Sequence, residues 1–468
     1  MPRPFTRTPG FVLMLCFTTI LLDGYDLVVY GTTTGSLMKQ FGVDKAAVAN
    51  VHSLTLAGLM IGFLVAGPLA DRIGRRVVMI SGVAVFSVLC LVCAFAPSFE
   101  LFAAGRVLSG VGLGAVVPSA VSIASEFAPA RRRQLFNGMT LIGYPVGGVL
   151  ATLVGLAVLP SAEVISAADP ANEAWRWMYA VGGLGLLLAP VLHLLLPESP
   201  GYLAARGRHD EAERVATRYG VSIAVGLPES GAVETAPGNA SSNAPSGVRL
   251  LFTPRYVIAT IVFTLVMFCT QILTYGPSTW LPSMVGEMDF GGATGILALM
   301  MLQIGAVVGT IVGANLADRG GATRTVVPYF LLGAFSLFVL AFSGDLGPVI
   351  LFVAAFLAGV GTIGTSTLMY GVIAAHYPTS ARASAIGFCL GLGRVGGILG
   401  PQIGAIFVTA RSGLLAFMVP ALLGAVLVLV LATVGRTRER DRGASVPAPE
   451  AERIPPGERA PSEKSPIR

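Results

Sequence analysis

Long apolar stretches alternate with short polar ones along most of the chain. Each apolar stretch spans about 20 residues, the length that an α-helix needs to cross the hydrocarbon core of a bilayer. Six stretches precede a long polar segment and six follow it. They are residues 11–33, 48–70, 77–95, 100–124, 136–159, 175–196, 256–281, 293–316, 325–343, 348–373, 382–408 and 412–434. The pattern predicts an all-α integral membrane protein with twelve transmembrane helices.

The polar segments divide the chain into four parts. They are a six-helix bundle over 1–196, a linker loop over 197–250, a second six-helix bundle over 251–435 and a tail over 436–468. Within the linker, residues 200–219 have the pattern of an amphipathic helix on the membrane surface. Residues 221–247 are rich in Gly, Ala, Ser and Pro, as flexible linkers are. The tail is charged and rich in proline, a composition that predicts disorder.

Composition agrees with a membrane protein. Only 12% of the residues are charged and 54% are hydrophobic, whereas an average soluble protein has about 25% charged residues. The net charge of +6 comes from arginines beside the ends of the apolar stretches, and no basic face with interleaved aromatic residues indicates a nucleic-acid partner. The five cysteines lie inside apolar stretches without metal-ligand spacing. We therefore expect no metal, no cofactor and no nucleic acid, and a lipid bilayer as the surroundings.

The basic residues in the short loops predict how the chain is oriented, because cytoplasmic loops carry an excess of Lys and Arg. With the N-terminus in the cytoplasm, the outer loops hold only Lys39, Lys45, Arg176 and Arg411. The short cytoplasmic loops then hold Arg72, Arg75, Arg76, Arg131, Arg132, Arg133, Arg319, Arg324 and Arg382. This bias predicts an inner-membrane protein with both termini in the cytoplasm.

The two halves of the chain repeat one another. The sequence DRIG at 71–74 recurs as DRGG at 318–321. Around the fifth and eleventh stretches a longer match is present, in which Pro129, Arg133, Gly138, Gly147 and Gly148 align with Pro378, Arg382, Gly387, Gly396 and Gly397. Internal repeats are typical of secondary transporters, whose substrate site lies near the midplane between the halves. We expect two pseudo-symmetric bundles with a central site.

The loop between the second and third stretches carries GPLADRIGRR at 67–76. This segment resembles the G-x-x-x-D-R-x-G-R-R signature of the major facilitator superfamily at every position. The resemblance implies the major facilitator fold and a monomer. A glycine permits a tight turn between two helices, and the charges at the cytoplasmic rim can latch one conformation and release it in another. The residues expected to act in this gating are Asp71, Arg72, Gly74, Arg75 and Arg76.

Other polar residues are expected at the same rim. The second copy of the motif keeps Asp318 and Arg319 but lacks the two following basic residues, so the N-terminal copy should dominate gating. The segment PESPGYLAARGR at 197–208 resembles the PESPRWL segment that follows the sixth span in many members of the superfamily. Glu126 lies near the cytoplasmic end of the fourth stretch, where it is expected to gate together with the arginines at 131–133.

Charged residues inside the apolar stretches are candidates for function, because a charge at mid-bilayer costs about 2.5–3.5 kcal/mol. Asp23 and Asp26 lie three residues apart in the first stretch and so share one side of a helix. Two carboxylates in a medium of low dielectric constant disfavour joint ionisation. We therefore expect at least one of the two to bind and release a proton.

Two motifs narrow the resemblance to a subfamily. LLDGYDLVVYG at 21–31 resembles the D-G-Y-D signature of the aromatic acid:proton symporter family, and this resemblance covers the transmembrane core of the chain. GRVLSGVGLGA at 105–115 resembles the R-x-x-x-G-x-G-x-G pattern of the fourth span in proton-coupled members. The resemblance implies a proton-coupled importer of small organic anions, most simply aromatic carboxylates of the benzoate or hydroxybenzoate type. Arg106 would pair with Asp23 or Asp26 and modulate proton release.

Arg394 is the only charged residue deep in the C-terminal stretches. Its guanidinium group can bind a carboxylate through two parallel hydrogen bonds, and the repeat aligns it with Pro145, so it is not a copied structural feature. We expect Arg394 to anchor the carboxylate of the substrate. The aromatic candidates for stacking on a substrate ring are Tyr25, Tyr144, Tyr275, Trp280 and Phe388.

Two other transport functions share this fold. A multidrug proton antiporter is disfavoured because GYPVGG at 143–148 matches the G-P-x-x-G-G bend of antiporters only in part. A sugar or metabolite symporter is closer, since PESP and the TWLP at 279–282 occur in that branch, but Arg394 favours an anion over a neutral sugar. An enzyme is disfavoured because the chain carries no catalytic-histidine, metal or nucleotide motif. Neither the proton number nor the identity of the acid follows from the sequence.

Overall fold

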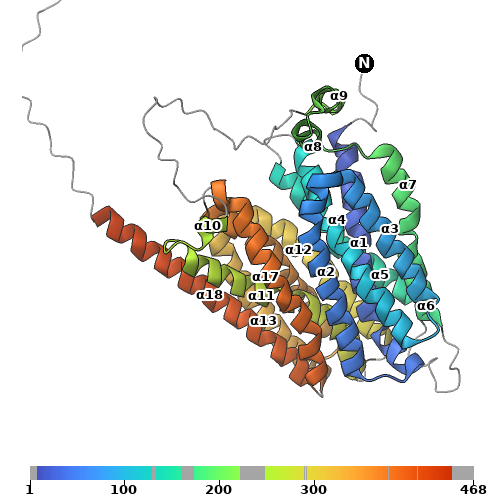
Figure 1. The fold of residues 1–468 in the computed structure, drawn as a ribbon. Coiled ribbons are helices and arrows are strands. Elements are labelled where there is room, and N and C mark those ends of the chain that lie inside the picture. Colours follow the sequence, from blue (N-terminus) through green and yellow to red (C-terminus); the bar gives the residue numbers. More distant parts are fainter. Residues whose placement is uncertain are drawn as a thin grey trace, which may run out of the picture.

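A computed structural model describes residues 8–128, 133–159, 173–221, 248–288, 290, 292–377, 379–407 and 409–444. In this part of the chain the regular elements are all helices (Figure 1). Twelve helical stretches are long and apolar enough to cross a membrane. This number confirms the predicted fold class.

The N-terminal half contains six spans, the sixth of them interrupted at Leu184. They are α1 (Pro9–Phe41), α2 (Lys45–Ile73), α3 (Arg75–Ala94), α4 (Phe99–Phe127), α5 (Arg133–Val158) and the pair α6 (Ala174–Gly183) and α7 (Gly185–Leu195). Three of these helices begin at side-chain caps, in which Thr8, Asp44 and Ser98 accept a hydrogen bond from a backbone N–H of the first turn. Such caps satisfy N–H groups that have no partner within the helix.

The C-terminal half repeats this plan. Its helices are α10 (Val248–Leu251), α11 (Val257–Gly286), α12 (Gly292–Gly320), α13 (Ala322–Ala341), α14 (Ser343–Leu346), α15 (Pro348–Gly361), α16 (Ile363–His376), α17 (Thr379–Ile406) and α18 (Ala410–Ala444). α15 and α16 together form one span. α18 continues past the bundle boundary predicted at 435, because its Arg- and Glu-rich end favours helix. The remaining tail and most of the predicted linker, 222–247, lie outside the described residues.

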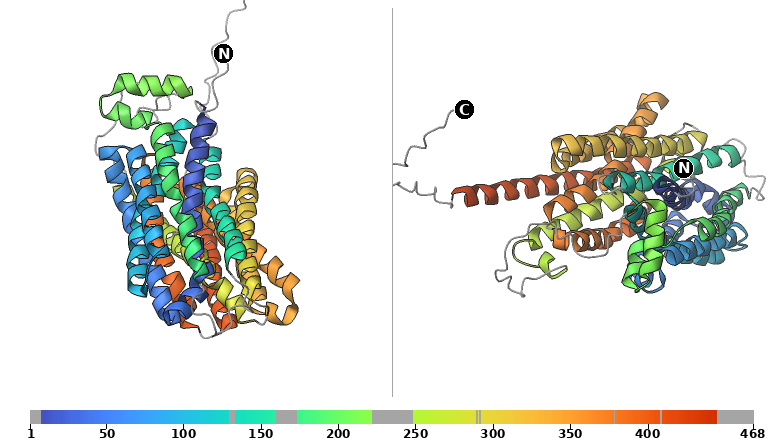
Figure 2. Two further views of the ribbon diagram at one scale, coloured as in Figure 1. Left: turned by 90° about the vertical axis from the view of Figure 1, so that its right-hand side faces the viewer. Right: turned by 90° about the horizontal axis from the view of Figure 1, so that it is seen from above.

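Two short helices follow the sixth span. They are α8 (Pro200–Ala205) and α9 (His209–Tyr219), so the prediction of one continuous helix over 200–219 is wrong. Gly207 adopts a φ of 74° between them, a left-handed conformation that ends a helix. Both helices lie across the N-terminal bundle at the end where the N-terminus is found, here called the terminal end (Figure 2).

Corresponding helices pack together in the two halves, as the sequence repeat predicts. α1 packs along α5 as α11 packs along α17, and α2 packs along α4 as α12 packs along α15. Two glycines at aligned positions permit the first pairing in each half. A Cβ atom at Gly147 would meet the carbonyl of Leu21, and one at Gly396 would meet the carbonyl of Phe268. Small residues of this kind let helix backbones approach closely in a membrane.

The two halves contact one another through α1 with α11, α2 with α17 and α5 with α12. Polar side chains join them at the end opposite to the N-terminus, here called the distal end. These distal contacts are the ion pair of Lys45 with Glu287 at 2.7 Å, the hydrogen bond from Ser53 to the Ile398 carbonyl at 2.6 Å, and that from Gln402 to Asn50 at 2.8 Å. Among the described residues, these contacts and the hydrogen bond from Gln402 to the Ser53 hydroxyl at 3.1 Å would have to break for the halves to separate there.

Adding a methyl group at Gly147 should destabilise the fold. The Cβ atom of Gly147→Ala has no room beside the Leu21 carbonyl, and overpacking of this kind costs about 1–3 kcal/mol. We expect a lower melting temperature for the purified variant in detergent. Gly138→Ala on the same helix is the matched control, because no atom lies within 4 Å of its added Cβ. Equal melting temperatures for the two variants would contradict the packing argument.

Candidate functional site

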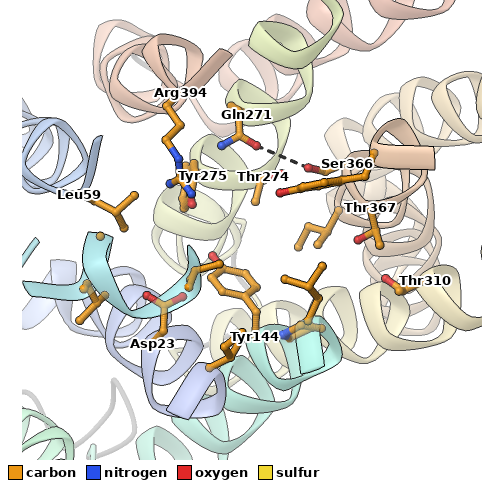
Figure 3. A pocket seen from close by; sticks show the side chains of 18 residues that line it. Asp23, Leu59, Tyr144, Gln271, Thr274, Tyr275, Thr310, Ser366, Thr367 and Arg394 are labelled. Carbon is orange, nitrogen blue, oxygen red and sulfur yellow. Dashed lines mark hydrogen bonds between the residues drawn. The ribbon is translucent and has the colours of Figure 1, made fainter. Parts of the chain in front are cut away.

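A cavity of about 100 Å³ lies between the two halves (Figure 3). This volume holds several water molecules or one small organic molecule. Its polar lining residues are Asp23, Tyr144, Gln271, Thr274, Tyr275, Thr310, Ser366, Thr367, Tyr370 and Arg394. Its apolar lining residues include Ile20, Leu59, Leu113, Val117, Leu141 and Ile363. The cavity therefore combines charged, hydroxyl and apolar surface in one small space.

Asp23 and Arg394 bring opposite charges to this cavity from the two halves (Figure 3). Asp23 is 3% exposed and lies within electrostatic range of Arg394. Among the described residues, neither Oδ1 of Asp23 nor Nε of Arg394 has a hydrogen-bond partner. The guanidinium carbon of Arg394 lies 4.6 Å from the ring centre of Phe63. The arginine thus keeps hydrogen-bonding capacity for an anion, and the carboxylate keeps capacity for a proton.

Close helix contacts hold these two side chains in place. A Cβ atom at Gly24, next to Asp23, would meet the backbone of Tyr144, so α1 lies directly against α5 at this level. On α17, a Cβ atom at Gly393, next to Arg394, would lie 2.6 Å from the Cβ atom of Met267. Each charged residue therefore extends from a rigid pair of helices, and its position relative to the cavity is fixed by the backbone.

Asp26 lies in a second buried cluster, outside the cavity lining. Its Oδ1 atom forms an ion pair with Arg106 at 2.7 Å and accepts a hydrogen bond from the Cys90 thiol at 3.0 Å. The guanidinium carbon of Arg106 lies 5.5 Å from the ring centre of Tyr30 and 5.6 Å from that of Tyr179. A cation is attracted to the face of an aromatic ring at this distance. The charge of Asp26 is therefore compensated within the N-terminal half.

The two aspartates consequently have different surroundings, although only three residues separate them. At 3.6 residues per turn, side chains three residues apart point about 60° away from each other. That difference directs Asp23 toward the cavity and Asp26 toward Arg106 on α4. Arg106 pairs with Asp26 and not with Asp23 in this structure, which resolves the two alternatives that the sequence leaves open.

Glu126 links the fourth span to the segment after the sixth span at the terminal end. It forms an ion pair with Arg75 and accepts hydrogen bonds from the Ser199 hydroxyl and from the backbone N–H of Gly201, the latter at 3.1 Å. The predicted partners of Glu126 at 131–133 carry no described side chains. The PESP segment therefore supplies contacts of Glu126 that sequence reasoning missed.

The signature loop contacts the same segment. The backbone N–H of Arg76 donates to Glu198 at 3.1 Å, and Arg206 donates to the carbonyls of Asp71, at 3.3 Å, and Arg72. Gly74 has a φ of 104°, which confirms the tight turn predicted between α2 and α3. All these contacts stay within the N-terminal half. In the second copy of the motif, Arg319 is exposed, and the side chain of Asp318 lies outside the described residues.

The structure places two of the five aromatic candidates at the cavity and three away from its lining. Tyr144 and Tyr275 line the cavity. The Tyr25 hydroxyl instead donates to the carbonyl of Met178 at 2.9 Å, and the indole N–H of Trp280 donates to that of Pro401 at 2.8 Å. The ring of Phe388 packs edge-on against that of Phe252. The last three rings are occupied by packing within their own halves, so they do not face the cavity.

Several cavity residues were missed because each is an ordinary polar residue in an apolar span. Gln271 and Thr274 lie three residues apart on α11, Gln271 lies four residues before the predicted Tyr275, and Thr367 and Tyr370 lie three residues apart on α16. Polar residues at helical spacing within a membrane span form one polar face. A search for such faces in the C-terminal spans could have found them.

Comparison with known proteins shows which family the sequence of this chain matches. The family model described as Major Facilitator Superfamily matches residues 16–347 and 297–467. The benzoate transport protein of Acinetobacter baylyi is 31% identical over 90% of this chain and 89% of its own length. The gallate transporter of Pseudomonas putida is 33% identical over 88% of each chain. The gentisate transporter of Corynebacterium glutamicum is 30% identical over 89% of this chain and 86% of its own.

Solved structures show the same fold at lower identity. The xylose transporter of E. coli in an inward-open conformation superposes with a TM-score of 0.71 at 16% identity, over 90% of this chain and 95% of that one. A bacterial homologue of the human lysosomal transporter Spinster has a TM-score of 0.67 at 17% identity, over 91% of this chain and 97% of that one. Both agree with the two-bundle arrangement described above.

Removing one partner of the buried Asp26–Arg106 pair should destabilise the protein strongly. Arg106→Leu leaves an uncompensated buried carboxylate, a change that costs about 3–5 kcal/mol, whereas Arg106→Leu combined with Asp26→Leu leaves no charge at this site. We expect a large loss of melting temperature in detergent for the single variant and partial recovery in the double variant. Asp23→Asn, which removes no ion pair of the described residues, should melt as wild type does. Equal losses for Asp23→Asn and Arg106→Leu would contradict this distinction.

Proposed function

The chain belongs to the major facilitator superfamily, and on that premise we propose that it is a proton-coupled importer of small aromatic carboxylates, of the benzoate or hydroxybenzoate type. The observation that carries the proposal is Arg394, a cation with free hydrogen-bonding capacity beside a cavity between the two halves. The relatives at about 30% identity, named as transporters of benzoate, gallate and gentisate, support the class of substrate.

In this proposal the carboxylate of the substrate binds to Arg394. The guanidinium group offers two parallel N–H donors to a carboxylate, a geometry that a lysine could not supply. The rings of Tyr144 and Tyr275 border the same space and can stack on the substrate ring, since offset or edge-on ring contacts are favourable. Leu59 and Ile363 supply apolar contacts. Such a site suits a flat anion better than a neutral sugar, which would leave the arginine unpaired.

The proton is assigned to Asp23 and not to Asp26. Asp26 is compensated by Arg106, so protonating it would leave a buried unpaired cation at a high cost. Asp23 has no ion-pair partner among the described residues and borders the cavity. It can therefore take up a proton together with the anion. One proton moving with one monoanion carries no net charge. With this stoichiometry the membrane potential neither drives nor opposes transport, whereas each net charge moved through 100 mV would change the free energy of transport by about 2.3 kcal/mol.

Transport itself would occur by alternating access, in which the two bundles rock about the central site. We place the protein in the inner membrane as a monomer with both termini in the cytoplasm, on the loop-charge bias. The distal contacts then close the outer side. The rim cluster of Arg75, Glu126 and the PESP segment braces the N-terminal bundle on the inner side, so that it moves as one body.

Transport assays test both assigned residues. Purified protein in proteoliposomes with an inward proton gradient should accumulate labelled benzoate or 4-hydroxybenzoate, and a protonophore should abolish the accumulation. Arg394→Ala should lose at least about tenfold of the uptake rate, since a charged hydrogen-bonded pair contributes about 1.5–3 kcal/mol. Asp23→Asn should lose gradient-driven accumulation but keep the exchange of internal for external substrate.

Arg411→Ala is the matched control for the arginine, because Arg411 lies at the distal end and pairs with Asp345 at an exposed site. It should keep wild-type uptake. Accumulation of neutral sugars but no carboxylate would overturn the substrate assignment. Export of cationic drugs against the proton gradient would indicate the antiporter function instead. An Asp23→Asn variant that still accumulates substrate would overturn the assignment of the proton.

Alternating access also predicts that fastening the distal contacts stops transport. A Lys45→Cys, Glu287→Cys double variant places thiols on either side of the boundary between the halves, where the native side chains lie 2.7 Å apart. A short bifunctional thiol reagent should abolish uptake, and a reductant that cleaves the reagent should restore it. An Arg208→Cys, Glu211→Cys variant is the control, since both residues lie in the α9 region of one half. Unchanged uptake after complete distal cross-linking would contradict the rocking motion.

A further inference from the structure

The wall of the cavity that lies away from Arg394 carries two threonine hydroxyl groups. Thr310 on α12 and Thr367 on α16 both line the cavity. Figure 3 shows them on the side opposite to Asp23 and Arg394, with their side chains directed toward the enclosed space. The mechanism proposed above uses the charged side and the aromatic rings but leaves this wall without a function.

These two hydroxyl groups are free, which is unusual for threonines in membrane spans. A threonine in a helix normally donates to the carbonyl one turn earlier, as Thr274 does to Thr270 at 2.8 Å and Thr362 does to Ala358 at 2.6 Å. Within the described part of the chain, Thr310 and Thr367 form no hydrogen bond of that kind, or any other. Both hydroxyl groups therefore remain available to a bound molecule.

A third polar group adjoins this wall. The side-chain carbonyl of Gln271 accepts a hydrogen bond from the Ser366 hydroxyl at 3.5 Å, across α11 and α16 (Figure 3). The contact holds the amide group of Gln271 between Arg394 and the wall. Ser366 is thereby committed to Gln271, and Thr274 donates to Thr270. Of the serine and threonine residues that line the cavity, Thr310 and Thr367 are therefore the two whose hydroxyl groups form no hydrogen bond within the described spans.

We propose that Thr310 and Thr367 form a subsite for a ring hydroxyl group of the substrate, an inference that rests on the proposed function of the cavity. With the carboxylate bound at Arg394, a ring substituent at the remote 4 or 3 position points toward this wall. A substituent at the 2 position stays beside the carboxylate. The protein therefore prefers 4-hydroxybenzoate and 3-hydroxybenzoate to benzoate, and it treats 2-hydroxybenzoate much as it treats benzoate.

The preference follows from the chemistry of the two hydroxyl groups. A threonine hydroxyl can donate one hydrogen bond and accept others, and so can a phenol, so the two match without any fixed orientation. Benzoate would instead place a C–H group against these oxygens and leave them without a partner. A site that hydrogen-bonds a substrate hydroxyl discriminates against an analogue lacking that group more strongly than a purely apolar site does. Discrimination of about two- to tenfold for each hydrogen bond is expected.

The test measures inhibition of labelled benzoate uptake into proteoliposomes by unlabelled 4-hydroxybenzoate and by unlabelled benzoate. For wild type, 4-hydroxybenzoate should inhibit at a concentration several-fold lower than benzoate. In Thr310→Val and Thr367→Val, which keep the side-chain shape but lose the hydroxyl group, the two concentrations should approach one another, because benzoate has no hydroxyl group for the subsite to bind. Thr367→Ser, which restores a hydroxyl group, should restore most of the preference.

Thr365→Val is the matched control on the same helix, because the Thr365 hydroxyl donates to the carbonyl of Gly361 and does not line the cavity. It should keep the wild-type ratio. If wild type takes up benzoate without preferring 4-hydroxybenzoate, or if Thr310→Val and Thr367→Val leave the ratio unchanged, the subsite is overturned and the proposed function stands. If wild type takes up neither acid, the proposed function fails and the subsite fails with it.

Discussion

A bilayer offers no water to a charged group, so each ionised side chain within the spans needs a partner or a polar cavity. This constraint separates the charged residues deep in the described spans, Asp23, Asp26, Arg106 and Arg394, into two kinds. Asp26 and Arg106 satisfy it in one half, through an ion pair enclosed by aromatic rings. Asp23 and Arg394 lie in different halves and both border the cavity. The first two residues compensate one another by an ion pair, whereas the second two form no ion pair among the described residues and border a polar cavity instead.

The division has a consequence for motion. An ion pair inside one bundle is unaffected when the bundles rock, and it therefore contributes to the rigidity of the N-terminal half. Charges on opposite sides of the boundary change their separation with every such movement, so their interaction depends on conformation. The close contacts at Gly147 and Gly396 keep each bundle rigid enough for this difference to matter. Packing without voids makes a bundle move as a unit rather than deform.

Hydropathy was sufficient to predict the spans and the two halves, because the length and apolarity of each helix are imposed by the bilayer. The repeat aligned Gly147 with Gly396, and in the structure an added Cβ atom at either position would meet a backbone carbonyl of the neighbouring helix. The constraints set by glycine residues and by the thickness of the bilayer depend on short stretches of sequence. Such constraints can be recognised from a single sequence. The tight turn at Gly74 belongs to the same class.

The rotation of each helix about its axis could not be predicted in this way. Asp23 and Asp26 differ in environment because packing of α1 against α4 and α5 directs one toward the cavity and the other toward Arg106. The same rotation decides that Tyr275 borders the cavity while Trp280, five residues later on α11, bonds to a backbone carbonyl. Aromatic residues suit a core and a binding site equally well, so residue type did not distinguish between them.

The cavity itself follows from the way in which the two halves meet. Two halves with the same fold, related by pseudo-symmetry, would give the cavity two similar walls. The walls differ, because Arg394 lies on one side and the residue aligned with it in the repeat, Pro145, has no charge. The opposite side carries hydroxyl groups that donate to no backbone carbonyl in the described spans. Polar groups without partners are expensive in a membrane protein unless a ligand or water satisfies them. Oδ1 of Asp23, Nε of Arg394 and the hydroxyl groups of Thr310 and Thr367 have no partner among the described residues, and all four side chains line the same small space between the halves, which is the physical reason to place binding there.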